Sequence, residues 1–326
     1  MPILCRVTRG DLTESIHVAF AVAVDEKDEI VFSTGDPYHL TCIRSSLKPF
    51  QAAAAIKAGA MDAAGFTEKE IALACASHKG EDMHVDTARS MLEKLGLTVD
   101  DYECGAHFPS DKITRRQMIK DGKEPEAIHN NCSGKHAGML ALAKHLGEGT
   151  TGYTKKTHPV QKVIFQLIEE YTGLRNIPTE LDGCSVPTPF MSLETIARLF
   201  QKLGSGKCPE LNCVFDAMCA HPELVGGTNH FDSLFIKALE GRGITKVGGE
   251  SVRGVTIRKE NGGCIGLAIK VLDGNFRALP IATMKLLECL ELLMDGELRK
   301  LDKFRVRILR NHNQFEIGRI EAIIEV

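Results

Sequence analysis

Serine and lysine side chains occur in this sequence at spacings that suit acyl transfer. In the segment RSSLKPF, Ser45 and Lys48 are three residues apart, so a helix would place them on one face within hydrogen-bonding reach. A lysine that desolvation keeps neutral can take the proton of a serine hydroxyl. Ser77 in CASHKGE and Lys246 in KVGGE offer the same groups next to a helix and a hairpin. These four residues are therefore candidates for nucleophilic catalysis.

Each candidate also has a purely structural interpretation. Ser45 could lie near a helix start beside a solvated lysine, Ser77 could cap a helix, and Lys246 could protect the edge of a sheet. Against this, the helix predicted after Ser45 is apolar nearly all round, which places the serine turn next to the core. The order Ser-x-x-Lys, serine turn and Lys-x-Gly also resembles the three-part active site of serine β-lactamases and penicillin-binding enzymes.

A second group of reactive side chains lies in two loop-like segments. HNNCSGKHAGM (129–139) contains Cys132, Lys135 and His136 ahead of a helix, and ELDGCSVPTPF (180–190) contains Asp182 and Cys184 between glycine and proline residues. Loops that carry so many polar and reactive groups are usually functional sites. Two thiolates suit zinc, but lysine is an uncommon ligand that must lose its proton, so His136 or water would complete the shell. The alternative is that both cysteines are free thiols beside a substrate pocket.

The elements that must position these groups follow from hydrophobic periodicity. Apolar, β-branched runs predict two hairpins, over 16–24 with 30–35 and over 251–258 with 264–272, the second with Asn261 and Gly262 in its turn. A final strand is expected over 315–326. Helical patterns fill the space between, with the best-marked helices at 47–61, 68–77, 85–96, 136–147, 160–173, 193–204 and 281–294.

This arrangement predicts an α+β protein made of one catalytic domain with two lobes. Strands from both ends of the chain would form one antiparallel sheet flanked by helices, over residues 1–60 and 240–326. Residues 61–239 would form an inserted helical lobe. A cleft between lobes is the usual place for a ligand.

Composition narrows the partners and the compartment. A formal net charge of -3 lacks the basic excess of a nucleic-acid-binding protein. Eleven cysteines, an odd number spread along the chain, suit reduced thiols better than a disulfide framework. No secretory leader or membrane-spanning run is evident. We therefore expect a soluble, cytoplasmic protein with no membrane partner.

The motifs HNNCSGKHAGM, DGCSVPTPF, RSSLKPFQ, CASHKGE and HPELVGG together resemble the Rhizobium-type L-asparaginase family, also called class 3 or asparaginase II. The resemblance implies a fold of the penicillin-binding and β-lactamase type, a homodimer, and two serine–lysine tandems, Ser45 with Lys48 and Ser77 with Lys246. It also implies a zinc ion held by Cys132, Lys135 and Cys184, and supporting roles in substrate binding for His136 and Asp182. No organic cofactor is expected.

The resulting hypothesis is hydrolysis of the side-chain amide of L-asparagine through an acyl-enzyme. Ser45 would attack, Lys48 would pass its proton to departing ammonia, and Ser77 with Lys246 would relay protons and support the oxyanion. Either serine could be the nucleophile. Two alternatives are a β-lactamase or penicillin-binding-type acyl hydrolase, and a non-enzymatic zinc-binding or thiol-sensing protein. The hypothesis requires both hydroxyls, each with an uncharged amine beside it, to act at one site.

Overall fold

The computed structural model describes residues 1–260 and 262–324, which form two compact units. The sheet unit contains Met1–Ser46, Phe190–Ser205 and the chain from Ala238 onward. The helical unit contains Leu47–Pro189 and Gly206–Lys237. Asn261, expected in a hairpin turn, and residues 325–326 of the expected last strand lie outside the described residues.

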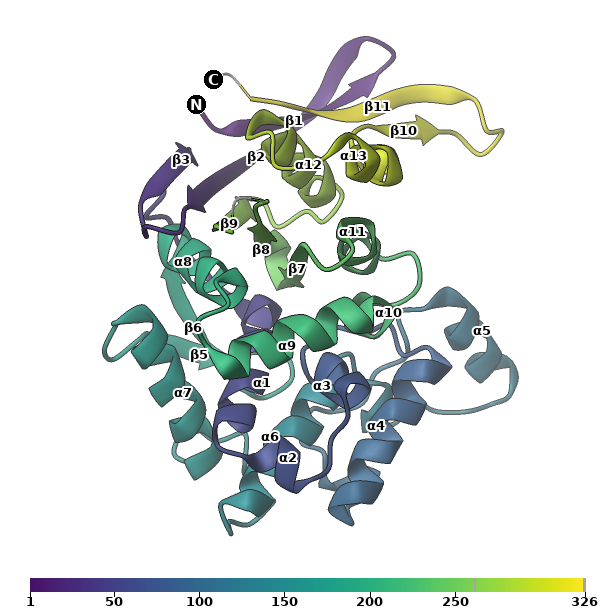
Figure 1. Ribbon diagram of the computed structural model, residues 1–326. Coiled ribbons are helices and arrows are strands. Elements are labelled where there is room, and N and C mark those ends of the chain that lie inside the picture. Colours follow the sequence, from purple (N-terminus) through teal and green to yellow (C-terminus); the bar gives the residue numbers. More distant parts are fainter. Residues whose placement is uncertain (261, 325–326) are drawn as a thin grey trace. The chain divides into compact units, whose positions relative to one another are not determined.

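An eight-stranded antiparallel sheet organises the sheet unit (Figure 1). Its strands follow the order β10-β11-β1-β2-β9-β8-β7, and β3 pairs with β2. Strands from both ends of the chain meet because β1 pairs with β11, and both predicted hairpins form, as β2 with β3 and β8 with β9. The bounds are β1 Ile3–Arg9, β2 Leu12–Val24, β3 Ile30–Thr34, β7 Gly243–Gly248, β8 Val252–Arg258, β9 Cys264–Val271, β10 Arg307–Arg310 and β11 Glu316–Ile323.

Two helices cover opposite faces of this sheet. On one face, Ile281 of α12 (Leu279–Cys289) packs with Val7 and Ile320 of the sheet. On the other, α8 (Leu193–Gly204) contacts β2, β8 and β9. The strand register places Gly254 and Gly266 on the α8 face, because side chains alternate between faces along a strand. The predicted α+β class, an antiparallel sheet flanked by helices, is confirmed.

The absence of side chains at two glycines lets α8 approach the sheet. A Cβ added to Gly266 would lie 2.1 Å from the backbone nitrogen of Gln201, and one added to Gly254 would lie 1.8 Å from the ring of Phe200. The strongly amphipathic sequence LETIARLFQKLG therefore buries its apolar side directly against strand backbone.

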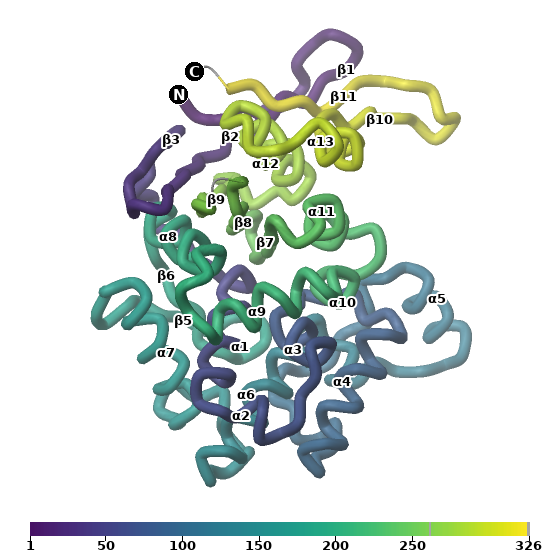
Figure 2. Tube along the Cα trace, in the orientation of Figure 1, coloured from purple at the N-terminus to yellow at the C-terminus, as the bar shows by residue number. Residues whose placement is uncertain are grey.

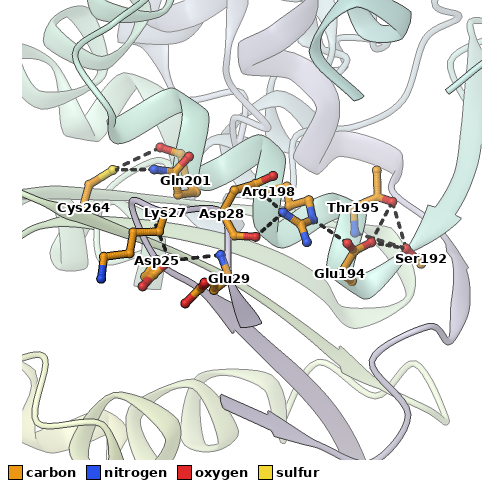
Figure 3. A network of polar contacts seen from close by, with 10 residues as sticks. All are labelled: Asp25, Lys27, Asp28, Glu29, Ser192, Glu194, Thr195, Arg198, Gln201 and Cys264. Carbon is orange, nitrogen blue, oxygen red and sulfur yellow. Dashed lines mark hydrogen bonds and ion pairs between the residues drawn. The ribbon is translucent and has the colours of Figure 1, made fainter. Parts of the chain in front are cut away.

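Polar contacts tie α8 to the turn between β2 and β3 and to β9 (Figure 3). Arg198 pairs with Glu194 one turn earlier in α8 and with Asp28 in the turn. Asp25 accepts hydrogen bonds from the backbone nitrogens of Lys27 and Glu29, which closes the turn. Gln201 donates its amide to the Cys264 sulfur at 3.3 Å, so both edges of α8 are anchored.

Helices dominate the helical unit, and Figure 2 shows their path along the chain. Apolar α1 packs against α6, α7 and α9, which explains why a helix apolar nearly all round is buried. The bounds are α1 Lys48–Lys57, α2 Ala60–Ala63, α3 Glu68–Ala74, α4 Asp82–Leu95, α5 Lys112–Lys120, α6 Ser133–His145, α7 Pro159–Thr172, α9 Pro209–Ala220 and α10 Pro222–Gly226. Among the described residues, no helix has the length and apolar character needed to cross a membrane.

The remaining elements include two of the places where the chain passes from one unit to the other. Strand β4 (Leu40–Cys42) pairs with residues 190–192 of β6 (Pro187–Ser192), while β5 (Thr179–Leu181) pairs with residues 187–189. Helix α11 (Phe231–Leu239) leads into the last part of the sheet unit, where α13 (Asp295–Leu301) follows α12.

The two units differ from the predicted lobes in two segments. Residues 47–60, expected with the sheet, group with the helical unit because α1 is surrounded by helices. Residues 190–205, expected in the helical lobe, group with the sheet unit because α8 packs on β2, β8 and β9.

Candidate active site

The amine of Lys48 lies at the centre of a polar cluster inside the helical unit. Lys48 is the first residue of α1, with Pro49 in the first helical turn, and it is buried. Its Nζ lies 2.5 Å from the carbonyl oxygen of Ala76, 3.1 Å from Oγ of Ser77 and 3.2 Å from the carbonyl oxygen of Asn131. A lysine–serine pair is therefore present, and its serine is Ser77.

The number of hydrogens on the Lys48 amine determines which hydrogen bonds it donates and accepts. A charged ammonium would donate all three of its hydrogens to these three oxygens. A neutral amine would donate two hydrogens to the carbonyls of Ala76 and Asn131 and keep its lone pair for the Ser77 hydroxyl. In both states Lys48 and Ser77 share one hydrogen bond, so a proton can pass between them without movement of the backbone.

Ser77 is held in a short segment just after α3. Its backbone nitrogen donates to the carbonyl of Val225 at 3.0 Å, and the nitrogen of His78 donates to the carbonyl of Asn131 at 3.3 Å. The capping box of Thr67 and Glu70 fixes the other end of α3. Ser77 itself remains partly exposed, as a hydroxyl that must meet a substrate should be.

Ser45 and Lys246 belong to the sheet unit. Ser45 is partly exposed in a 3₁₀ turn, Arg44–Leu47, that leads into α1. Its neighbour Ser46 donates to the backbone carbonyl of Lys246 at 2.9 Å, which joins this turn to β7. The Lys246 side chain is fully buried, and its Nζ lies 2.8 Å from the carbonyl of Val247. Both expected tandems pair a residue of one unit with a residue of the other, and they stay predictions.

The predicted thiol cluster assembles within the helical unit. Cys132 immediately precedes α6, Lys135 lies in its first turn, and Cys184 lies in the loop after β5, yet the Nζ of Lys135 is 2.8 Å from the sulfur of Cys184. All three side chains are buried. Asp182 is half-buried in the same loop, where its carboxylate accepts a hydrogen bond from the nitrogen of Gly183 at 2.7 Å.

Electrostatics within this cluster favour one thiolate. A hydrogen bond from Cys184, helped by the charges of Lys48 and Lys135, holds the pKa of Cys132 well below its ordinary value despite burial. The same hydrogen bond and burial raise the pKa of Cys184. Burial alone would lower the pKa of Lys135, but the neighbouring Cys132 and Cys184 raise it. The cluster thus contains a thiolate, a thiol and an ammonium in contact.

Two residues that contact this region, Asn131 and His78, were not among the site residues predicted from sequence. The Asn131 carbonyl accepts from Lys48 and from the His78 nitrogen, and His78 lies 2.9 Å from Oγ of Ser133 through its Nε2. Burial lowers the pKa of His78 well below its ordinary value, so this imidazole is neutral at physiological pH. His78 adjoins Ser77 in CASHKGE, but Ser133, the hydroxyl that its ring contacts, is 55 residues away in the chain.

His136, the remaining predicted substrate-binding residue, is fully buried in α6. Its Nδ1 lies 2.7 Å from the hydroxyl of Tyr153, and burial lowers the pKa of the imidazole well below its ordinary value. Among the described residues, no group of three or more His, Cys, Asp or Glu side chains could hold a metal ion. Any metal in the thiol cluster would therefore need the Lys135 amine as its third protein ligand.

Known proteins resemble this chain over most of its length. The family model described as L-asparaginase II matches residues 5–322. A search of curated proteins gives no significant match. The solved β-lactamase from Sphaerobacter thermophilus DSM 20745 is 13% identical with a TM-score of 0.45, covering 85% of this chain and 92% of its own. The TLA-1 extended spectrum β-lactamase is 12% identical with a TM-score of 0.37, covering 78% of this chain and 84% of its own.

Proposed function

The chain belongs to the L-asparaginase II family and is an L-asparaginase, and we propose that it releases ammonia from L-asparagine through a serine–lysine acyl-enzyme. The observation that carries this mechanism is the hydrogen bond between the buried Lys48 amine and the Ser77 hydroxyl. An amine that two backbone carbonyls already hold in place is well suited to accept and return one proton.

In the proposed reaction, the Ser45 oxygen attacks the carbon of the side-chain amide while its proton moves to Lys48. Lys48 passes a proton through Ser77 to the amide nitrogen, so the carbon–nitrogen bond breaks and ammonia leaves. Water then attacks the ester, giving aspartate and restoring the Ser45 hydroxyl. Lys246 and Ser77 support the oxyanion that forms in each step.

The substrate's charged ends would meet the thiol cluster and its loop. The Asp182 carboxylate can pair with the α-ammonium group, and His136 can hydrogen-bond an oxygen of the amino acid. Both residues are in the helical unit with Lys48 and Ser77.

Zinc fits the three donors that converge in the helical unit. Cys132 and Cys184 supply the soft sulfur ligands that zinc prefers, and Lys135 supplies a nitrogen already 2.8 Å from the Cys184 sulfur. The ion would bind in exchange for the protons of Lys135 and Cys184. When bound, it would supply a Lewis-acidic centre that helps to hold the α-amino or α-carboxylate group of the substrate.

A cytoplasmic homodimer completes the proposal. The odd number of cysteines, spread along the chain, suits reduced thiols in a reducing compartment. On strands β1, β2, β10 and β11, apolar side chains remain exposed by a third to a half, which suits burial by a second copy: Leu4 36%, Ile16 52%, Ile308 41% and Ile323 41%. Sedimentation of the purified chain tests the dimer.

An ammonia-release assay on asparagine, glutamine and a β-aspartyl peptide tests the activity, and two serine variants test the mechanism. We expect asparagine to be the best substrate. Ser45→Ala should lower kcat by about 10⁴-fold, as expected for loss of a nucleophile, and Ser77→Ala by about 10²-fold, as expected for loss of a proton relay.

Two results would change this proposal. If Ser45→Ala keeps near-normal activity while Ser77→Ala abolishes it, the hydroxyl bonded to Lys48 is the nucleophile. If the protein forms a stable adduct with a labelled β-lactam, seen by mass spectrometry, and releases no ammonia from any amide, it is a β-lactam-reactive acyl hydrolase.

A further inference from the structure

Tyr153 contacts the Nδ1 side of the His136 ring, and surrounding residues hold it in place. Its side chain is fully buried, and its backbone carbonyl accepts the amide of Gln161 at 2.9 Å. The Glu103 carboxylate binds the residues on both sides of Tyr153, accepting from the nitrogen of Gly152 and from Oγ1 of Thr154 at 2.6 Å. The phenol ring meets the His136 ring edge to face, with centroids 5.5 Å apart. The position of the Tyr153 hydroxyl is therefore determined by its surroundings.

The directions of two hydrogen bonds follow from the number of hydrogens available. The Glu103 backbone N–H must donate, and it does so to the Tyr153 hydroxyl oxygen at 2.9 Å. The phenol has a single hydrogen, and its other neighbour is Nδ1 of His136 at 2.7 Å. If Nδ1 carried a hydrogen, the buried phenol hydrogen would have no acceptor among the described residues. The phenol therefore donates to Nδ1, and the proton of the neutral imidazole lies on Nε2.

That Nε2–H group has no hydrogen-bond partner among the described residues, although the side chain is fully buried. A buried donor without an acceptor costs about 1–3 kcal/mol, and a ligand or water that supplies an acceptor would recover this cost. His136 is one turn along α6 from Cys132 and adjoins Lys135. A molecule bound beside the thiol cluster could supply the acceptor that this N–H group lacks.

We propose that Tyr153 is a positioning residue: it holds His136 as the Nε2–H tautomer, so that this N–H donates to an oxygen of the bound amino acid substrate. This rests on the proposed function only in placing His136 at the substrate. The same tautomer has no lone pair on Nε2, so His136 is not a ligand of the zinc ion.

Nitrogen NMR of protein labelled with [¹⁵N]histidine reads the tautomer without any activity. The His136→Gln variant identifies the His136 signals by their disappearance. The wild-type protein should show a protonated Nε2 and an unprotonated Nδ1 that accepts a hydrogen bond, and added L-aspartate should shift the Nε2–H signal. A protonated Nδ1 in the wild-type protein overturns the proposal, even if the enzyme is an active asparaginase.

A matched pair of tyrosine variants tests the effect on the reaction. Tyr153→Phe removes the donor to Nδ1, whereas Tyr102→Phe removes a buried hydroxyl that has no hydrogen-bond partner among the described residues. Tyr153→Phe should raise the KM for asparagine about 10-fold, with a smaller change in kcat, and should give His136 signals of both tautomers. Tyr102→Phe should leave both constants within about 2-fold. Equal KM values in the two variants, or a single unchanged tautomer in Tyr153→Phe, overturn the proposal.

Discussion

Two segments that are far apart in the chain bring two sulfurs and one amine together, and the chemistry of this cluster depends on these three side chains. Lys135 contacts Cys184 across 49 positions of sequence, and Cys132 carries the thiolate because Cys184 and two lysines stabilise it. In the absence of a metal, Lys135 is an ammonium whose partners raise its pKa. The cluster is therefore balanced in charge, and a divalent cation would replace protons and keep that balance.

Metal content gives a direct prediction at this scale. Protein dialysed against micromolar zinc should hold about one zinc ion per chain, measured by inductively coupled plasma mass spectrometry. Cys184→Ser should weaken binding by at least about 100-fold, because one of two sulfur ligands is lost.

Cys213→Ser is the matched control. Cys213 is a free cysteine of the same unit, and within the described residues it does not contact Cys132, Lys135 or Cys184. Its zinc content should equal that of the wild-type protein. If Cys184→Ser binds zinc as tightly as Cys213→Ser, the three-ligand site is wrong and the two cysteines act as thiols only.

Helices and strands determine the positions of these side chains, and sequence periodicity predicts some of these elements but not others. Both hairpins, the closing helix and the helix after Ser45 were predictable, because their apolar periods are regular. The first strand, β1, was not predicted, since ILCRVTR alternates with charged residues and is only recognisable once β2 and β11 flank it. The Lys48–Ser77 bond could not be predicted from spacing, because the helical i, i+3 rule relates Lys48 to Ser45 alone.

The contact between α8 and the sheet gives a prediction at the scale of elements. In Gly266→Ala, the new methyl group would meet the backbone of Gln201 at 2.1 Å, and backbone cannot move aside as a flexible side chain can. We expect a loss of about 2–4 kcal/mol in the free energy of unfolding, measured with urea.

Gly296→Ala is the control within the same unit. Gly296 lies in α13, and a methyl group added there would meet no heavy atom of the described residues within 4 Å. This variant should gain up to about 1 kcal/mol from better helix propensity. A Gly266→Ala protein as stable as Gly296→Ala would show that α8 does not pack closely on β9.

At the scale of the whole molecule, buried imidazoles are unevenly distributed. His78, His84 and His136 are all buried in the helical unit, and burial is the main cause that lowers the pKa of each. The rings of His78 and His84 also stack with centroids 4.9 Å apart, so a charge on one disfavours a charge on the other. The helical unit should therefore respond to acid in a range where carboxylates are still charged.

The sign of this response follows from proton binding. Below the ordinary histidine pKa of 6.5, the unfolded chain binds protons at these residues and the folded unit does not. The stability that the neutral imidazoles contribute is complete above pH 6.5 and declines as pH falls toward their lowered folded values. Each histidine should remove about 1.4 kcal/mol per pH unit in that range. Hydrogen exchange read by mass spectrometry, with a chelator present so that metal release adds nothing, should show helical-unit peptides losing protection first between about pH 7 and pH 5.

His84→Gln separates this cause from a general effect of acid. In His84, Nδ1 accepts from the nitrogen of Glu81 at 3.1 Å and Nε2 lies 3.1 Å from the carbonyl of Glu223, so the residue stabilises the fold outside the proposed reaction. Glutamine cannot take up a proton in this range, so the variant should be less stable at pH 7.5 but should lose less of its stability on acidification to pH 5.5. An equal loss in both proteins would mean that burial of His84 as a neutral ring does not govern the acid response of the helical unit.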